Sequence, residues 1–349
     1  MNPPPSGPPS RSFKSLWQRR DVRWIRLIVG TGLSFLFLWL AFRNVPLAEV
    51  LEAFRGARYR FVGLALVLVL VSPFLRAARW RLLFHPHQEG LSLLRLSEVL
   101  LVGQMLNILV PTRIGELGRI YLLGQLESRS RPRILGTIAL EKTLDILMLF
   151  LLALLIPLFV TLPSWFRDAR LSFGALAVAL FLAALLLSHR QAWIIDVVAH
   201  ASQLLPAAWQ DRVERAFRQA LGSLGVLRNL RVNLRLQAWS LAILIDSVLT
   251  NYAIFLALDM GLSLAAALFL LAVLQVGVAV PSAPGKLGVF HYLCVLALGV
   301  FGVPKEPAIA YAVLLHVVVF VPPSLLGAVF LWWETVRGRS VPSHQDGRA

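Results

Sequence analysis

The sequence predicts an all-α polytopic membrane protein. Of the 349 residues, 58% are hydrophobic and only 15% are charged, with a mean hydropathy of +0.72, whereas about 25% of the residues in a soluble domain are charged. Several apolar stretches reach the roughly 18–20 residues that a helix needs to cross the hydrocarbon core of a bilayer. They lack the alternation of barrel strands, and helices therefore remain as the spanning form that satisfies the backbone in lipid.

The apolar stretches divide the chain into about six full spans and two broken helical hairpins. Each hairpin has two apolar pieces separated at a proline, Pro111 in the first and Pro281 in the second. The full spans are expected at residues 25–42, 61–84, 134–160, 171–188, 236–258 and 308–333, and the hairpins at 98–111 with 113–126 and at 264–280 with 286–302. Together they form one transmembrane domain, 25–335, between a disordered basic tail, 1–24, and a second tail, 336–349.

The segment 192–222 has a different pattern from the spans. Trp209, Val213, Phe217 and Leu221 recur every four residues, and arginines occupy other positions around the helix. This pattern is typical of an amphipathic helix that lies on the anionic headgroups at a membrane surface.

The placement of the basic residues predicts the orientation. If the N-terminus is cytoplasmic and both hairpins return to the side they entered, most of the 34 Lys and Arg residues face the cytoplasm. This asymmetry agrees with the positive-inside rule. We therefore expect both termini and the segment 190–235 to be cytoplasmic. The net charge of +16 then reflects topology, and we expect no nucleic-acid partner.

An internal repeat links the two hairpins. Residues 110–118 read VPTRIGELG and residues 280–288 read VPSAPGKLG, and each copy interrupts a hydrophobic hairpin at the same point. Three full spans separate the copies, so the hairpins enter from opposite faces and form an inverted repeat, as in many transporters. We expect a pseudo-two-fold axis in the membrane plane, with Thr112 and Ser282 close together near mid-depth.

The residues of the repeat suggest an anion site. Each proline ends the incoming half-helix, and Thr112 and Ser282 are natural N-caps for the outgoing one. Two helix N-termini that point inward would attract an anion such as phosphate. Gly115, Gly118, Gly285 and Gly288 allow close backbone approach, and a role in helix packing alone is the alternative explanation.

Ionisable residues at membrane depth need a functional or structural reason. Arg113, Glu116 and Arg119 are three residues apart and share a helix face. One interpretation makes the cations ligands of an anionic headgroup and the acids their partners or proton carriers; the other is a structural salt-bridge network. The predicted substrate-binding set is Asn107, Thr112, Arg113, Glu116, Arg119, Ser282, Gly285 and Lys286, and the predicted coupling network comprises Glu141, Lys142, Asp145 and Asp246.

Several kinds of chemistry lack their motifs in this sequence. It has no Cys/His cluster, no Ser–His–Asp arrangement and no phosphate-binding P-loop, so we expect no metal, no cofactor and no ATP-driven pumping by this chain. The single cysteine, Cys294, cannot form an intrachain disulfide.

Three motifs resemble a known family. The run from Asn107 to Arg119, the element EKTLD from Glu141 to Asp145 and the element PSAPGKLG from Pro281 to Gly288 look like the signatures of the flippase-like transmembrane domain of lysylphosphatidylglycerol synthases. The resemblance implies a protein of the bacterial plasma membrane that moves a phospholipid or polyprenyl-type lipid between leaflets. In those synthases a soluble aminoacyl-transfer domain follows this region, whereas this chain ends at Ala349. We therefore expect no enzymatic activity.

Membrane lipids with anionic headgroups are thus the expected partners, and a homo-oligomer is compatible with the sequence. Two alternatives stay open: a secondary transporter of a soluble anion, and an accessory subunit or membrane enzyme of lipid or glycan biosynthesis. A cavity that opens sideways to the bilayer favours lipid, whereas a closed aqueous path favours a solute.

Overall fold

The computed structural model describes residues 54–110, 114–155, 207–277 and 284–336, together with isolated positions at 52 and between 175 and 202. All regular secondary structure in these stretches is helical. The predicted spans at 25–42 and 171–188 and both predicted tails lie outside the continuous stretches.

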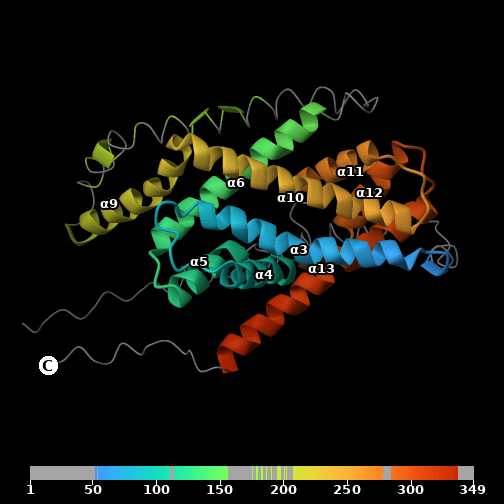
Figure 1. Ribbon diagram of the computed structural model, residues 1–349, viewed down its shortest axis with the longest axis horizontal. Helices are drawn as coiled ribbons and strands as arrows, with labels where there is room; N and C mark the ends of the chain where they lie inside the picture. Colours follow the sequence, from blue (N-terminus) through green and yellow to red (C-terminus); the bar gives the residue numbers. More distant parts are fainter. Residues whose placement is uncertain are drawn as a thin grey trace, which may run out of the picture.

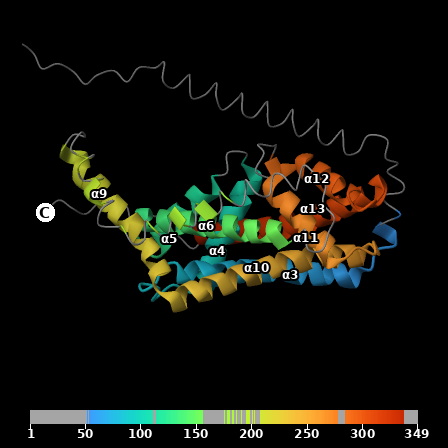
Figure 2. The same ribbon diagram turned by 90° about the horizontal axis from the view of Figure 1, so that it is seen from above.

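Three described helices are long and apolar enough to cross a membrane: α3 (Tyr59–Leu82), α10 (Leu230–Ala257) and α13 (Lys305–Val336). They fall where the sequence predicts full spans. The helix α6 (Arg131–Leu155) coincides with a fourth predicted span. Helices α3 and α10 pack side by side along the long axis of the molecule (Figures 1 and 2). The chain is therefore a helical membrane protein.

Both predicted hairpins are present as pairs of short helices. The first pairs α4 (Leu93–Leu109) with α5 (Gly115–Leu126). The second pairs α11 (Leu264–Gly277) with α12 (Val289–Gly299), and the short 3-10 helix η3 (Pro284–Lys286) precedes α12. At 1.5 Å per residue these helices are about 16–26 Å long, less than the roughly 30 Å of a hydrocarbon core. The described arms of the second hairpin are shorter than the sequence predicts.

The hairpins lie toward opposite ends of the long axis, α4 and α5 at one end and α11 and α12 at the other (Figures 1 and 2). The turn of the second hairpin, η3, nevertheless packs against α4 of the first. The two hairpins therefore meet between the ends of the molecule.

Helix α13 contacts both hairpins. It packs against α12 and α4, and Pro322 and Pro323 lie inside it. A Cβ atom added at Gly327 would lie 2.6 Å from the carbonyl oxygen of Leu101 on α4, so the two backbones approach closely. At the far end of this contact, Arg95 Nη1 lies 2.6 Å from Glu334 Oε1. This ion pair fixes the last turns of α13 to the first turn of α4.

The outgoing half-helices begin later than predicted. Ile114 is at the N-cap position of α5 and Gly288 at that of α12, and neither cap has a side-chain hydrogen bond. The predicted N-cap roles of Thr112 and Ser282 are therefore wrong. The first residue of α5, Gly115, is three positions after Thr112, and the first residue of α12, Val289, is seven positions after Ser282. Helix α5 starts at a glycine that packs against α4, and α12 starts after two glycines with left-handed φ values.

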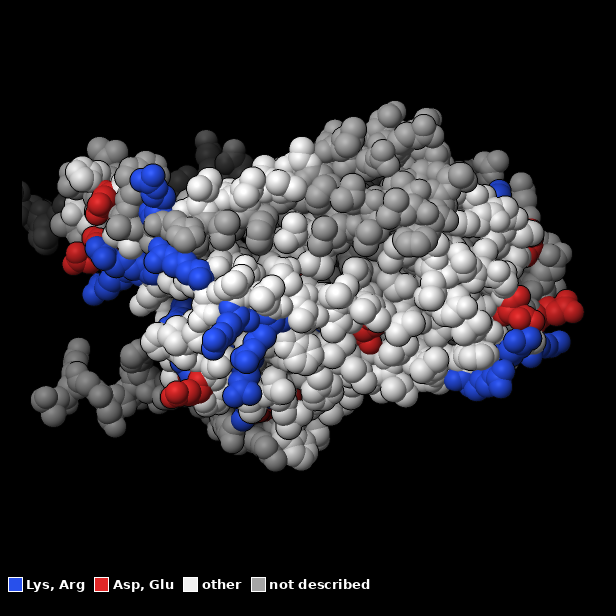
Figure 3. All heavy atoms as spheres, turned by 45° about the horizontal axis from the view of Figure 1, so that its top comes forward, with Lys and Arg blue, Asp and Glu red and all other residues white. Residues whose placement is uncertain are grey.

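The charged side chains gather at the two ends of the molecule, and the visible surface between them is largely uncharged (Figure 3). The amphipathic helix α9 (Ala207–Gly222), followed by the 3-10 helix η2 (Ser223–Arg228), lies at the same end as α5 (Figure 1). It covers the second half of the predicted segment 192–222 and packs against α6. This distribution is typical of a membrane protein with an apolar belt.

Candidate functional site

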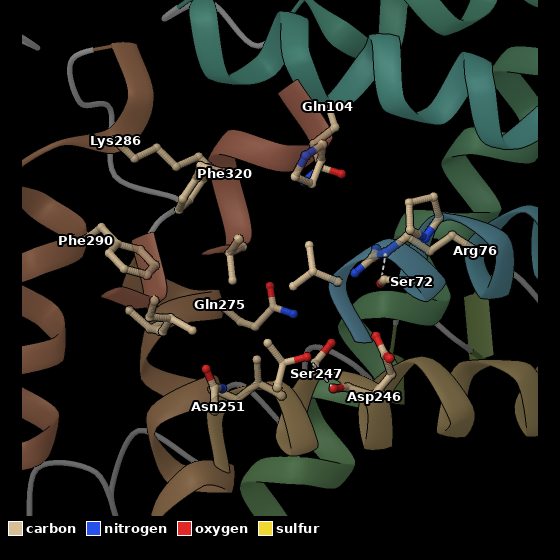
Figure 4. Close-up of a pocket in the computed structure, with 18 residues that line it drawn as sticks. Ser72, Arg76, Gln104, Asp246, Ser247, Asn251, Gln275, Lys286, Phe290 and Phe320 are labelled. Atoms are coloured by element: carbon tan, nitrogen blue, oxygen red, sulfur yellow. Dashed lines mark hydrogen bonds between the residues drawn. The ribbon is translucent and has the colours of Figure 1, made fainter. Parts of the chain in front are cut away.

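A cavity of about 260 Å³ lies where the second hairpin meets the long helices. Its walls come from α3, α4, α10, α11, η3, α12 and α13 (Figure 4). The lining positions on α3, α10 and α13 lie more than one turn from either end of those helices, so the cavity opens within the membrane-spanning part of the chain. Half of its lining is polar: Ser72, Arg76, Gln104, Asp246, Ser247, Thr250, Asn251, Gln275 and Lys286.

Two cations face each other across this cavity. Figure 4 shows Lys286 on one side and Arg76 on the other, with Gln275 between them and Asn251 on the wall below. Lys286 lies on the turn of the second hairpin, and its Nζ is 5.5 Å from the centroid of the Phe320 ring. Positive charge that is enclosed by helices and partly shielded from water interacts strongly with an anion. The cavity therefore suits a small anionic group.

The backbone of the turn directs Lys286 into the cavity. Gly285 and Lys286 both have left-handed φ values, +74° and +56°, and Gly288 follows at +80°. Glycine adopts this conformation freely, whereas a lysine at positive φ is uncommon. Among the described residues, only Leu287 lies within 4 Å of a Cβ atom added at Gly285. Gly285 therefore serves the path of the turn rather than close helix packing.

The opposite wall carries a chain of three polar side chains. Arg76 Nε donates a hydrogen bond to Ser72 Oγ at 3.4 Å, and the Ser72 hydroxyl donates to the carboxylate of Asp246. Asp246 is buried on α10 and points toward Ser72 and Arg76 on α3 (Figure 4). Among the described lining residues it is the one carboxylate. Asp246 and Lys286, predicted for separate roles, thus line the same cavity.

A second polar cluster, the buried ion network, lies outside this cavity. Arg119 on α5 donates to the Glu141 carboxylate on α6 through both terminal guanidinium nitrogens, Nη1 at 3.3 Å and Nη2 at 2.5 Å. Arg79 on α3 reaches Asp145 Oδ1 at 2.6 Å and Glu141 Oε1 at 3.9 Å. Arg79, Arg119 and Glu141 are at most 5% exposed. The network joins three helices, and its charges are paired within it.

The rim of the ion network lies beside the turn of the first hairpin. Lys142 Nζ is 3.7 Å from Glu116 Oε1 and 4.0 Å from Asp145 Oδ2. Asn107 Oδ1 accepts the backbone N–H of Gly115 at 2.7 Å, and its Nδ2 donates to Glu116 at 3.4 Å. The N-terminus of α5 is therefore already occupied by a side chain of α4. Glu116 pairs with Lys142 and Asn107 rather than with Arg119.

The structure separates the predicted site residues into groups. Lys286 and Asp246 line the cavity, and Gly285 is next to it in the turn. The residues of the ion network and its rim do not line the cavity: Asn107, Glu116, Arg119, Glu141, Lys142 and Asp145. Thr112, Arg113 and Ser282 lie outside the described residues, and their predicted roles in substrate binding stay predictions, as does the proximity of Thr112 to Ser282.

Two arginines were missed by sequence reasoning. Together with Arg81, Arg76 and Arg79 form a basic run near the end of α3 that predicts the cytoplasmic flank of this span, but Arg76 lines the cavity and Arg79 is 1% exposed. The sequence does contain one signal for the burial of these arginines. Arg76 and Arg79 lie one turn apart on one span, and Glu141 and Asp145 lie one turn apart on another. Because charges at membrane depth need partners, this spacing favours pairing between the two spans.

Residues 25–327 match the family model described as the lysylphosphatidylglycerol synthase TM region. The chain belongs to this family. This confirms the resemblance carried by the three motifs. No solved structure matches the chain.

Several membrane proteins are similar to this family member over most of its length. A UPF0104 membrane protein of Methanothermobacter thermautotrophicus is 28% identical over 299 residues, which cover 80% of this chain and 87% of that protein. A second, from Pyrococcus horikoshii, is 21% identical over 328 residues, 88% of this chain and 96% of that protein. A third, from Methanocaldococcus jannaschii, is 20% identical and covers 85% and 91%. These names describe membrane proteins and state no substrate.

Proposed function

We propose that the protein is a lipid flippase or transporter that moves an anionic lipid between membrane leaflets. The observation that carries this proposal is the cavity with Lys286 and Arg76 on opposite walls, set among membrane-spanning helices. In this proposal the two cations bind the lipid phosphate, and the apolar half of the lining covers the adjoining part of the lipid. Arg119 and Glu141 hold helices together and do not bind substrate.

Two further features support a lipid as substrate. The lining combines cations with apolar and aromatic side chains, including Phe290 and Phe320, which suits an amphiphile better than a free ion. The family is named after the transmembrane region of a synthase whose product, lysylphosphatidylglycerol, is a lipid.

We also propose that the two hairpins form an inverted repeat and that the end carrying α9 is cytoplasmic. The short helices of both hairpins, their opposite ends in Figures 1 and 2 and the contact of η3 with α4 support the repeat. The basic residues of η2 and of the first turns of α6 and α10 support the orientation. The bacterial plasma membrane and the absence of enzymatic activity remain proposals that follow the family resemblance.

The experiment is transport in liposomes with leaflet-resolved detection of fluorescent phosphatidylglycerol. Lys286→Met removes the charge but retains most of the side-chain volume, so we expect transport to fall at least about tenfold, the effect of about 1.4 kcal/mol, with little change in melting temperature. Lys286→Arg keeps the charge with a different geometry and should recover part of the activity. The matched control is Lys305→Met, because Lys305 is exposed at the first residue of α13.

The outcomes separate the candidate functions. Normal transport by Lys286→Met would remove Lys286 from the site. Uptake of inorganic phosphate by the wild-type protein, without movement of any labelled lipid, would establish the soluble-anion transporter instead. Loss of folding in Lys286→Met, with normal folding in Lys305→Met, would assign Lys286 a structural role.

A further inference from the structure

We propose that Asp246 couples proton binding to anion binding in the cavity, so that its carboxylate takes up a proton when an anion reaches Arg76. This inference rests on the proposed function and adds the regulation of the same site. It concerns the wall formed by α3 and α10, opposite Lys286 (Figure 4).

The geometry places a substrate anion and Asp246 in competition for one cation. Arg76 forms no direct ion pair with a residue that the structure describes, and Ser72 lies between its guanidinium and the Asp246 carboxylate. A phosphate bound to Arg76 would therefore lie on the other side of the same hydroxyl. Two negative charges in this confined space repel each other.

Protonation removes this repulsion. A neutral Asp246 carboxyl leaves the charge of Arg76 to the anion, and Ser72 can turn its hydroxyl to accept from Asp246 or donate to the anion. Because linkage is reciprocal, anion binding that favours the protonated carboxyl requires that protons favour anion binding by the same factor. Movement of the anion across the membrane would then carry a proton with it.

The other groups around Asp246 do not provide this coupling. Helix α11 contributes the neutral Gln275, and α13 contributes apolar lining residues, with His316 outside the lining. The charged groups nearest on other elements are engaged elsewhere or lie across the cavity. Lys286 in η3 is on the opposite wall, Glu141 and Asp145 on α6 are held by Arg79, Lys142 on α6 pairs with Glu116, and Arg228 in η2 precedes the first turn of α10. Asp246 is therefore the titratable carboxylate that an anion at Arg76 meets in the described part of the chain.

The test measures binding of fluorescent phosphatidylglycerol to the purified full chain in phosphatidylcholine nanodiscs, between about pH 5 and about pH 8. We expect the wild-type affinity to increase as the pH falls, by roughly 5- to 150-fold, the usual range for coupled sites. Asp246→Asn mimics the protonated carboxyl and should bind tightly at every pH. The control, Asp259→Asn, removes an exposed carboxylate that pairs with Arg58 and should behave like wild type.

A second measurement needs no variant. Mixing wild-type protein with phosphatidylglycerol in weakly buffered solution should withdraw protons, which a pH-indicator dye detects, and Asp246→Asn should abolish the signal. Lipid binding without proton uptake, or an unchanged pH dependence in Asp246→Asn, overturns the coupling while the flippase proposal stands. Proton uptake with inorganic phosphate but not with the lipid supports the coupling and overturns the lipid as substrate. If Asp246→Asn does not fold, the wild-type proton signal decides alone.

Discussion

The two broken hairpins share a sequence motif but use it in opposite ways. In the first, a Cβ atom at Gly115 would overlap the carbonyl oxygen of Gly103, and Asn107 binds the first N–H of α5. In the second, Gly285 and Gly288 permit a left-handed turn, and Lys286 lines the cavity. The repeat position is Glu116 in one hairpin and Lys286 in the other. The motif therefore packs the two helices of the first hairpin tightly together, whereas in the second hairpin it places a cation in the cavity.

This difference matches the two groups of charged residues at membrane depth, one of which is paired within itself and the other of which is net positive. The ion network beside the first hairpin contains paired charges, which satisfy one another. The described cavity lining beside the second hairpin contains two cations and one carboxylate. A surplus of positive charge in a cavity is expensive unless it binds an anion. The ion network is therefore suited to stabilising the fold, and the cavity is suited to binding an anion.

The largest expected effect is on the ion network. Glu141→Gln removes the charge shared by Arg119 and Arg79 and leaves the buried Arg119 without its ion-pair partner, so we expect a loss of about 3–5 kcal/mol of stability. Thermal unfolding in detergent measures it. The control is Glu306→Gln, a carboxylate in the first turn of α13, which should change little. A similar small change in both variants would show that the network does not hold the first hairpin in place.

The sequence predicted the hairpins but not the ion network in full. Pro111 and Pro281 interrupt apolar stretches, and such local signals are visible in the chain. Arg79 is bound by Asp145, 66 residues away, and its neighbours Arg76 and Arg81 suggest a cytoplasmic flank. Lys286 and Asp246 meet only because η3 and α10 border one cavity. Contacts between distant helices depend on packing geometry, which the motifs do not encode.

A smaller loss of stability is expected when a glycine of either hairpin is replaced by alanine, and the loss should differ between the hairpins. Gly115→Ala places a Cβ atom on the Gly103 carbonyl and the Asn107 side chain, and overpacking against backbone costs about 3 kcal/mol. Gly285→Ala makes only an ordinary contact with the Leu287 side chain but must hold a left-handed φ of +74°, which costs about 1–2 kcal/mol.

The same unfolding measurement, with chemical denaturant as a second probe, compares these two glycine variants. Equal losses would mean that both hairpins pack alike and would contradict the contrast between them. Gly222→Ala provides the reference, because nothing lies within 4 Å of its added Cβ atom and its φ is not left-handed.

The smallest effect concerns the equivalent positions Glu116 and Lys286. Glu116 lies in the first turn of α5, where a carboxylate favours the helix N-terminus, and it pairs with Lys142. Glu116→Gly should therefore lose about 1–2 kcal/mol of stability through helix propensity and the lost charge.

Lys286→Gly removes a left-handed lysine at φ +56°, a conformation that costs about 1–2 kcal/mol for a residue with a Cβ atom. The added backbone entropy of glycine offsets about 0.5–1 kcal/mol of that gain. We expect Lys286→Gly to be as stable as wild type or up to about 1 kcal/mol more stable, yet inactive in lipid transport. Such a result would identify Lys286 as a residue kept for binding at the expense of local backbone strain. A clear destabilisation of Lys286→Gly, equal to that of Glu116→Gly, would instead assign both repeat positions the same structural role.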